Sequence, residues 1–319
     1  MRQIKFFQII AGLLGLWAED ARRIPVGGQA VIEGVLMKGL DRWGLAVRKP
    51  NGDLHEETWR NSSRVKRYPW KLPVFRGVVV MCEMMATGFK ALGRSAEIAL
   101  EETQEKMTFK DILLAAGAAV LAVAGLFVAL PLWMGDLARS FLGASPFWSN
   151  VAEGVARGVI FIGYVAVIGV WEDIRQVFRY HGAEHKTINA FESGMEMTPA
   201  RIASCSRIHP RCGTSFLLIA VIVSIIVFSF LGGGGFLRRA LLRVVTLPLV
   251  IGLSYEIIRL TSKAGLVGQI LMYPVLSLQY LTTREPNAGQ IEVALASLNL
   301  ALSPNEPLSS SHTLPSNGD

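Results

Sequence analysis

Four long apolar stretches dominate the hydropathy pattern of this chain. They are residues 112–134, 155–171, 214–237 and 241–258. The first and third contain no charged side chain, and a bilayer crossing needs roughly 20 apolar residues. Arg157 interrupts the second stretch, and Arg243 and Glu256 lie near the ends of the fourth, where long charged side chains can reach the interface. The pattern predicts four transmembrane helices within residues 109–258.

Strand-like patterns precede the first of these stretches. Residues 27–37 form an apolar run framed by glycines, which indicates a strand. Residues 41–60 are predicted to form a β-hairpin that turns at Asn51-Gly52, a pair typical of type I′ turns. With the helix described next, these segments predict a small cytoplasmic α+β domain over residues 25–108.

A helix is predicted from Phe75 to about Glu102. Apolar side chains recur in it at helical spacing, and we interpret this methionine-rich face as core packing. Its members are Val78, Met81, Cys82, Met85 and Phe89. Glu33 stands out among apolar residues and glycines, because a carboxylate there must be paired by a salt bridge or bound to a metal if it is buried.

The two ends of the chain predict peripheral segments. Residues 1–24 hold an apolar run without a convincing cleavage site, which favours an interfacial helix over a signal peptide. Residues 259–302 are predicted to form interfacial and amphipathic helices, because glycines and prolines break their apolar run. Residues 303–319 are rich in Ser, Pro and Asn, which predicts a disordered tail.

Composition places the chain among membrane proteins. Hydrophobic residues make up 51%, charged residues 18%, and the mean hydropathy is +0.39. The net charge of +7 is interpreted as attraction to an anionic inner leaflet, and no aromatic-interleaved basic stripe indicates nucleic-acid binding. The lipid bilayer is therefore the expected partner. The fold class predicted is a mainly α integral membrane protein with four spans and a small N-terminal α+β domain.

Basic residues predict the orientation of the spans. Residues 1–110 hold 18 of the 32 Lys and Arg, and the loop of residues 172–213 holds six more. The loop of residues 135–154 has only Arg139, whereas residues 232–243 carry three arginines and disagree with the pattern. The positive-inside rule places both termini in the cytoplasm of a multi-pass plasma (inner) membrane protein. Three cysteines without a disulfide pattern agree with reducing surroundings.

The string His181-Gly182-Ala183-Glu184-His185 carries the candidate chemistry. Residues four apart share one face of a helix, so both imidazoles can point at one metal ion. Glu184 would then be the catalytic residue, a general base for water on that metal, as in the H-x-x-E-H order of inverzincins. The alternative is a solvated helix face.

A second cluster adds further metal ligands. His209 and Cys212 lie just before the third apolar stretch, and three of the five histidines fall within this part of the chain. Imidazole and thiolate suit a divalent metal such as zinc, so His181, His185 and either His209 or Cys212 form the predicted site. Glu192 competes as third ligand, and Cys212 could instead be a small buried side chain.

Several motifs together resemble those of the YqhQ-like family. They are residues 27–39, 75–78, 180–186, 209–216 and 281–286. The resemblance covers roughly residues 25–300 and implies a membrane protein of a group described as predicted metal-dependent enzymes, known from bacteria and plastids. It supports the architecture more than the chemistry.

Two classes of function follow. The first is a membrane-bound, metal-dependent hydrolase with its site at the cytoplasmic face. The second is a non-catalytic regulator or scaffold for a transporter or membrane enzyme, in which the histidines are structural or sense a metal. Without a phosphate loop or a nucleophile elbow in the sequence, the second class stays open.

Overall fold

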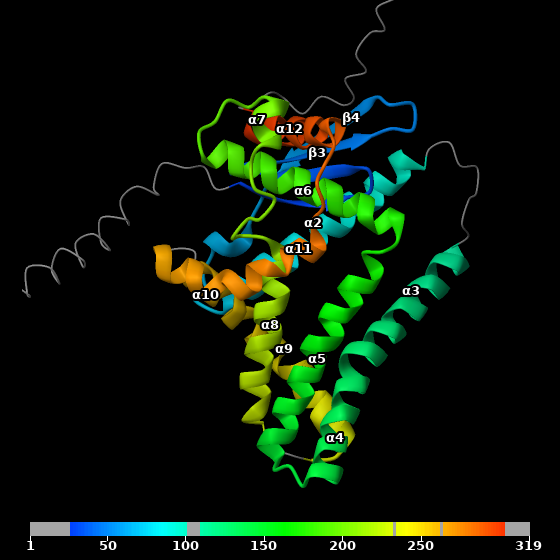
Figure 1. The fold of residues 1–319 in the computed structure, drawn as a ribbon, viewed down its shortest axis with the longest axis vertical. Coiled ribbons are helices and arrows are strands. Elements are labelled where there is room, and N and C mark those ends of the chain that lie inside the picture. Colours follow the sequence, from blue (N-terminus) through cyan, green and yellow to red (C-terminus); the bar gives the residue numbers. More distant parts are fainter. Residues whose placement is uncertain (1–25, 101–108, 232–233, 262–263, 304–319) are drawn as a thin grey trace, which may run out of the picture.

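A four-stranded antiparallel sheet lies at one end of the molecule, and a bundle of long helices extends away from it (Figure 1). The computed structural model describes residues 26–100, 109–231, 234–261 and 264–303. The interfacial helix expected in residues 1–24 and all but the first residue of the tail expected in 303–319 lie outside these ranges. The strands, in spatial and chain order, are β1 (Gly27–Val31), β2 (Gly34–Lys38), β3 (Arg42–Arg48) and β4 (Leu54–Arg60).

The first two strands replace the single strand predicted for residues 27–37, which was wrong. Val31 pairs with Gly34, so the chain reverses at Ile32-Glu33. Glu33 takes a positive φ of 49° there, and its carboxylate accepts hydrogen bonds from the Tyr180 hydroxyl at 3.1 Å and from Gln176 at 3.4 Å. The apolar run continues through the turn, which hides the reversal in the sequence.

The predicted hairpin is present in β3 and β4, with its turn at Asn51-Gly52. The turn is not of type I′, because Gly52 has a positive φ of 92° and Asn51 does not. The Gly52 N–H donates to the Lys49 carbonyl at 2.9 Å, and the Lys49 N–H donates to the Asp53 carbonyl at 2.8 Å. This is the three-residue hairpin loop in which only the last residue is left-handed.

Helices cover both faces of the sheet. Leu36 and Leu45 pack toward α2 (Phe75–Ala99), whereas Val35 and Ala46 pack toward α6 (Glu172–Glu192) and α12 (Ala288–Leu302). The alternation follows from the period of two along a strand. Short α7 (Pro199–Ala203) joins the same side as α6 and α12 (Figure 1).

Helix α2 packs through small residues, not through its methionine-rich face. Its buried positions are Gly77, Gly88, Ala91, Ser95 and Ile98. Met85 is 52% exposed and Phe89 is 67% exposed, so the interpretation of this face as core packing was wrong. Gly88 faces the Gln29 side chain of β1, and Ile98 and Met84 pack against the sheet cluster. The apolar face is therefore turned outward.

Three helices among the described residues are long and apolar enough to cross a membrane. They are Gly117–Phe141, Pro146–Ile168 and Phe236–Thr261. The first runs from α3 (Phe109–Ala124) through the π-helical turn η3 (Gly125–Ala129) into α4 (Leu130–Leu142); the others are α5 and α9. The expected span at residues 214–237 is α8 (Gly213–Ser229), an apolar helix of 17 residues that ends earlier than expected.

Helices α10 (Gly265–Ser277) and α11 (Gln279–Thr282) cross the end of the bundle nearest the sheet (Figure 1). They occupy the segment expected to be an interfacial or bundle-packed helix. Thr282 of α11 and Cys212 at the start of α8 contact His181 of α6, where the candidate chemistry lies.

Candidate metal centre

Helix α6 carries the H-x-x-E-H residues on one side. The helix begins with Glu172 and Asp173, whose negative charges interact favourably with the positive N-terminal end of the helix dipole. His181, Glu184 and His185 are three and four residues apart, so they share a face. That face is buried: Glu184 is 4% exposed and His185 is 1% exposed. The solvated-surface alternative therefore does not hold.

Cys212 completes a compact group with the two histidines. One ligand atom from each of His181, His185 and Cys212 lies within 4.8 Å of the other two, so these residues could hold a metal ion. Nε2 of His181 lies 3.2 Å from Sγ of Cys212. Nitrogen and sulfur ligands of one tetrahedral zinc ion are separated by about 3.5 Å, given the usual bond lengths. Cys212 is also the N-cap of α8, so the thiol joins α6 to the bundle.

Backbone carbonyls orient both imidazole rings. Nδ1 of His181 lies 2.8 Å from the Thr282 carbonyl oxygen, and Nδ1 of His185 lies 2.6 Å from the Arg207 carbonyl oxygen. A carbonyl only accepts, so each Nδ1 carries the hydrogen, and Nε2 of a neutral ring keeps its lone pair. Nε2 of His185 is buried without a hydrogen-bond partner among the described residues. This outer support is typical of metal-binding histidines, and the unpaired nitrogen fits a ligand role.

The pKa values of all three side chains in this group are shifted. Burial opposes ionisation of His181, but Cys212 raises the pKa of this imidazole to about 9. Burial likewise opposes ionisation of Cys212, but His181 and His185 hold the pKa of its thiol well below the usual value. Burial, together with His181, lowers the pKa of His185. Without a metal, the group therefore contains a thiolate paired with a protonated His181 and a neutral His185.

The Glu184 carboxyl group lies beside the His-Cys group and against β1 of the sheet. A Cβ on Gly28 of β1 would come within 3.0 Å of Glu184 Oε1, so the glycine leaves room for this carboxyl group. Oε2 of Glu184 is buried without a hydrogen-bond partner among the described residues. Burial raises the pKa of Glu184 to about 8, although His181 opposes the rise. Its carboxyl group is thus mostly protonated at neutral pH.

His209 and Glu192 lie beside the group but outside it. The ring centroid of His209 is 5.8 Å from that of His185, and its Nε2 lies 3.4 Å from Glu192 Oε2. Glu192 also forms an ion pair with Arg211. Burial lowers the pKa of His209 to about 4, although Cys212 opposes the change. Of the third ligands considered, the geometry groups Cys212 with the two histidines.

Three residues that sequence reasoning did not single out position this centre. Gly182 lets α6 approach the chain at Arg284, because a Cβ on the glycine would collide with the Arg284 carbonyl oxygen. The Arg284 N–H donates to the Phe178 carbonyl of α6 at 2.8 Å. Gln279 bonds the backbone of His209 twice, at 2.8 Å each. Gly182 and Arg284 lie within the 180–186 and 281–286 motifs, which were the available signals for these long-range contacts.

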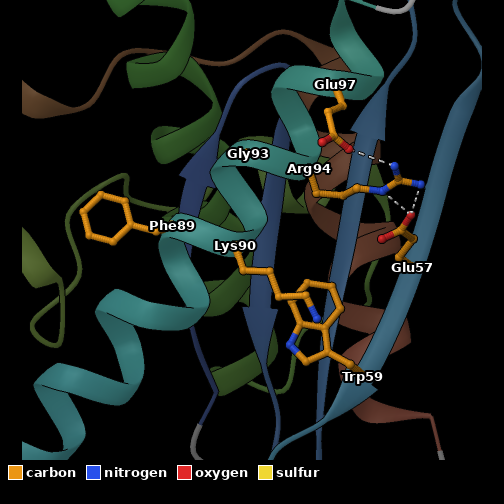
Figure 2. Close-up of a pocket in the computed structure, with 7 residues that line it drawn as sticks. All are labelled: Glu57, Trp59, Phe89, Lys90, Gly93, Arg94 and Glu97. Atoms are coloured by element: carbon orange, nitrogen blue, oxygen red, sulfur yellow. Dashed lines mark hydrogen bonds and ion pairs between the residues drawn. The ribbon is translucent and has the colours of Figure 1, made fainter. Parts of the chain in front are cut away.

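A pocket of 510 Å³ lies elsewhere, between α2 and β4 (Figure 2). Arg94 donates to Glu57 at 2.8 Å and to Glu97 at 3.1 Å, and the Lys90 ammonium lies 5.0 Å from the centre of a Trp59 ring. Phe89 projects from α2 to one side of these residues (Figure 2). The pocket is on the α2 side of the sheet, whereas the His-Cys group is on the α6 side, so the two are separate.

Comparison with known proteins agrees with the sequence motifs. Residues 72–304 match the model of a family described as a protein of unknown function, DUF1385. The chain is 32% identical over 290 residues to the uncharacterized protein YqhQ of Bacillus subtilis (strain 168), covering 86% of this chain and 91% of the relative. No solved structure matches the chain. The match to the family model over residues 72–304 and the 32% identity to YqhQ show that this chain belongs to the DUF1385 family.

Proposed function

We propose that this protein is a metal-dependent membrane enzyme, a hydrolase whose centre is formed by His181, His185 and Cys212. The observation that carries the proposal is the convergence of these three ligand atoms within 4.8 Å, with both Nδ1 atoms held by carbonyls. Three protein ligands leave a fourth position open, as in catalytic zinc sites, whereas structural zinc sites usually have four.

Glu184 supplies the proton chemistry in this proposal. Zinc held by three protein ligands lowers the pKa of a water molecule in the open position. Glu184 lies on the same helical face, is buried, and has a pKa raised to about 8. A carboxyl group with a pKa near neutrality exchanges protons readily at the working pH, which suits a general base that later returns the proton.

The proposed setting is the plasma membrane, with four spans and the centre at the cytoplasmic face. Two of the three arginines that disagreed with the positive-inside pattern do not count against this orientation. Arg239 and Arg243 are 4% and 5% exposed and pair with Asp136 and Glu153 inside the bundle, so they do not act as free loop charges. Helix α8 would be the fourth span; 17 residues are at the short end of the usual range.

The burial of the His181, His185 and Cys212 group favours a second candidate function. Cys212 is 8% exposed, and segments from α6, α8 and Thr282 converge on the group. A metal there would clip these segments together, so a structural or sensing site in a regulatory membrane protein is the alternative.

Elemental analysis of the purified full-length protein separates these possibilities. We expect one zinc or similar metal per chain, lost in the His181→Ala, His185→Ala double variant and kept in His55→Ala, a histidine on β4. Glu184→Gln should keep the metal and lose the cellular function. Absence of metal from the wild type would refute the site. Retained metal with intact function in Glu184→Gln would favour the regulatory role over catalysis.

A further inference from the structure

A second group of charges lies inside the helical bundle, at the end far from the sheet (Figure 1). We call it the arginine cluster. Its members are Asp136 of α4, Glu153 and Arg157 of α5, and Arg239 and Arg243 of α9. Ionisable side chains within apolar helices are costly, so such a cluster points to a functional role.

Short contacts form two sets within the cluster, one around Glu153 and one at Asp136. Arg243 donates to Glu153 at 2.7 and 3.0 Å and to Asn150 at 2.8 Å. Arg157 donates to Glu153 at 2.8 Å, and Arg239 donates to Asp136 at 2.5 Å. Glu153 is fully buried, and the two arginines are its hydrogen-bond and ion-pair partners.

Helix irregularity explains one further contact of Arg157. Pro131 follows the π-helical turn and has no N–H to donate to a carbonyl of that turn. Arg157 Nε donates at 3.1 Å to the Phe127 carbonyl, which belongs to the same turn. The side chain is thus held in the bundle by two different elements.

The cluster has more hydrogen-bond donors than acceptors that pair with them. Three guanidinium nitrogens are buried without a hydrogen-bond partner among the described residues: Nη1 of Arg157, Nε of Arg239 and Nη1 of Arg243. Three guanidinium groups against two carboxylates also leave one excess positive charge. Each unpaired buried donor is unfavourable, and an anion would satisfy both the charge and the hydrogen bonds.

The guanidinium groups lie near one another. Arg157 and Arg243 share Glu153 as partner, and both lie over the Phe228 ring, at 5.5 and 4.9 Å from its centre. Arg239 is one turn before Arg243 on α9. Planar guanidinium groups with several aligned donors are the preferred partners of phosphate and similar oxyanions.

We propose that the arginine cluster binds an oxyanion of the phosphate class within the bundle. The site is independent of the metal centre at the other end. The oxyanion can be free phosphate or the headgroup of an anionic lipid, which present the same oxygens to the arginines.

Equilibrium binding to the purified full-length protein in non-ionic detergent, with a chelator present, tests the proposal. The probes are inorganic phosphate, dioctanoyl phosphatidylglycerol and dioctanoylglycerol, which has the same chains without phosphate. We expect saturable binding of phosphate or of phosphatidylglycerol, and none of dioctanoylglycerol. Binding of phosphate identifies a free oxyanion; binding of phosphatidylglycerol alone identifies a lipid headgroup.

Variants test whether the oxyanion binds at the arginine cluster, because one should weaken binding and another should strengthen it. Arg239→Gln should weaken binding about tenfold, as expected for one lost charge-assisted hydrogen bond. Arg139→Gln is the matched control. Arg139 is an exposed arginine in the last turn of α4, and its variant should bind like the wild type. Glu153→Gln should bind more tightly, because it frees arginine donors, and it keeps the test valid if Arg239→Gln does not fold. Absence of saturable binding, or equal weakening by Arg139→Gln and Arg239→Gln, would overturn the proposal.

Discussion

Gly182 of α6 lies directly against the carbonyl oxygen of Arg284, with no room for a side chain between them. Both residues belong to motifs, and the contact is continued by the hydrogen bond from Arg284 N–H to Phe178. The Thr282 carbonyl that orients His181 is only two residues away along the chain. The fit of this glycine therefore determines whether His181 of the candidate metal centre keeps its backbone support.

Replacing Gly182 by Ala should destabilise the protein by about 1–3 kcal/mol, because the added methyl group overpacks a rigid backbone contact. The displaced Thr282 carbonyl should also lower the metal content. Thermal unfolding and elemental analysis measure both effects. Gly163→Ala on α5, where a Cβ would meet nothing within 4 Å, should be neutral or slightly stabilising. Equal behaviour of the two variants would contradict the packing argument.

The sequence indicates the local parts of this site better than the long-range parts. His181 and His185 follow from helical spacing, and Cys212 from its place before an apolar stretch. The contacts with Gly28 and Thr282 join segments more than a hundred residues apart along the chain, and no local pattern encodes such pairing. His209 looked equivalent to Cys212 because the two differ only by three positions, and only the fold separates them.

The fold, too, was predictable where it depends on local sequence and was not where it depends on long-range contacts. The hairpin at Gly52 was predictable because its turn is local, as were the apolar lengths of α3, α5 and α9. The turn at Glu33 was not, because apolar residues continue through it. On α2, helical periodicity identified an apolar face but could not tell whether the sheet or the surroundings would contact it, and Gly88 and Ala91 decided this through their small size.

In the metal-free protein, Glu184→Gln should reduce the loss of stability that accompanies a rise in pH. The pKa of Glu184 is raised from 4.5 to about 8, so the native state keeps a proton that the unfolded state releases. This contribution is fully present below about pH 4.5 and is lost as the pH rises through about 8. Melting temperatures in chelator at about pH 6 and pH 9 measure the effect. Glu97→Gln, an exposed control, should leave the wild-type slope unchanged.

Metal affinity should rise with pH toward about 9, because a metal must displace the proton of His181, whose pKa is raised to about 9. Competition with a chromophoric chelator across this range measures the dissociation constant. Cys212→Ser removes the thiolate that raises this pKa, so its affinity should be weaker and level off at lower pH. A pH-independent affinity in the wild type would show that His181 is not a ligand.

Gly52→Val should destabilise the sheet by about 1–2 kcal/mol, since Gly52 has a φ of 92° that a β-branched residue cannot adopt without strain. Thermal stability and protease resistance measure this change. Gly27→Val in β1 is the control, because Gly27 has ordinary backbone angles and open space around its Cβ position. If Gly52→Val were as stable as the control, the hairpin turn would have to be different.

Labelling of introduced cysteines tests the proposed orientation. In intact cells, an impermeant maleimide should label a cysteine at Ala144, between α4 and α5, and should not label one at His55 on β4. The background should lack Cys82, which is exposed. Labelling at His55 would place the sheet outside the cell and reverse the topology.

The cover of the sheet has a consequence for how the protein is made. Strands β1 to β4 leave the ribosome first, but α12, which covers Val35 and Ala46, is the last described helix of the chain. At usual rates of synthesis, the delay between β4 and α12 is on the order of 10–50 s. During this interval the candidate membrane helices are synthesised while one apolar face of the sheet lacks its final cover. Chains that stop before residue 288 leave part of that face uncovered, which makes them targets for chaperones and proteases.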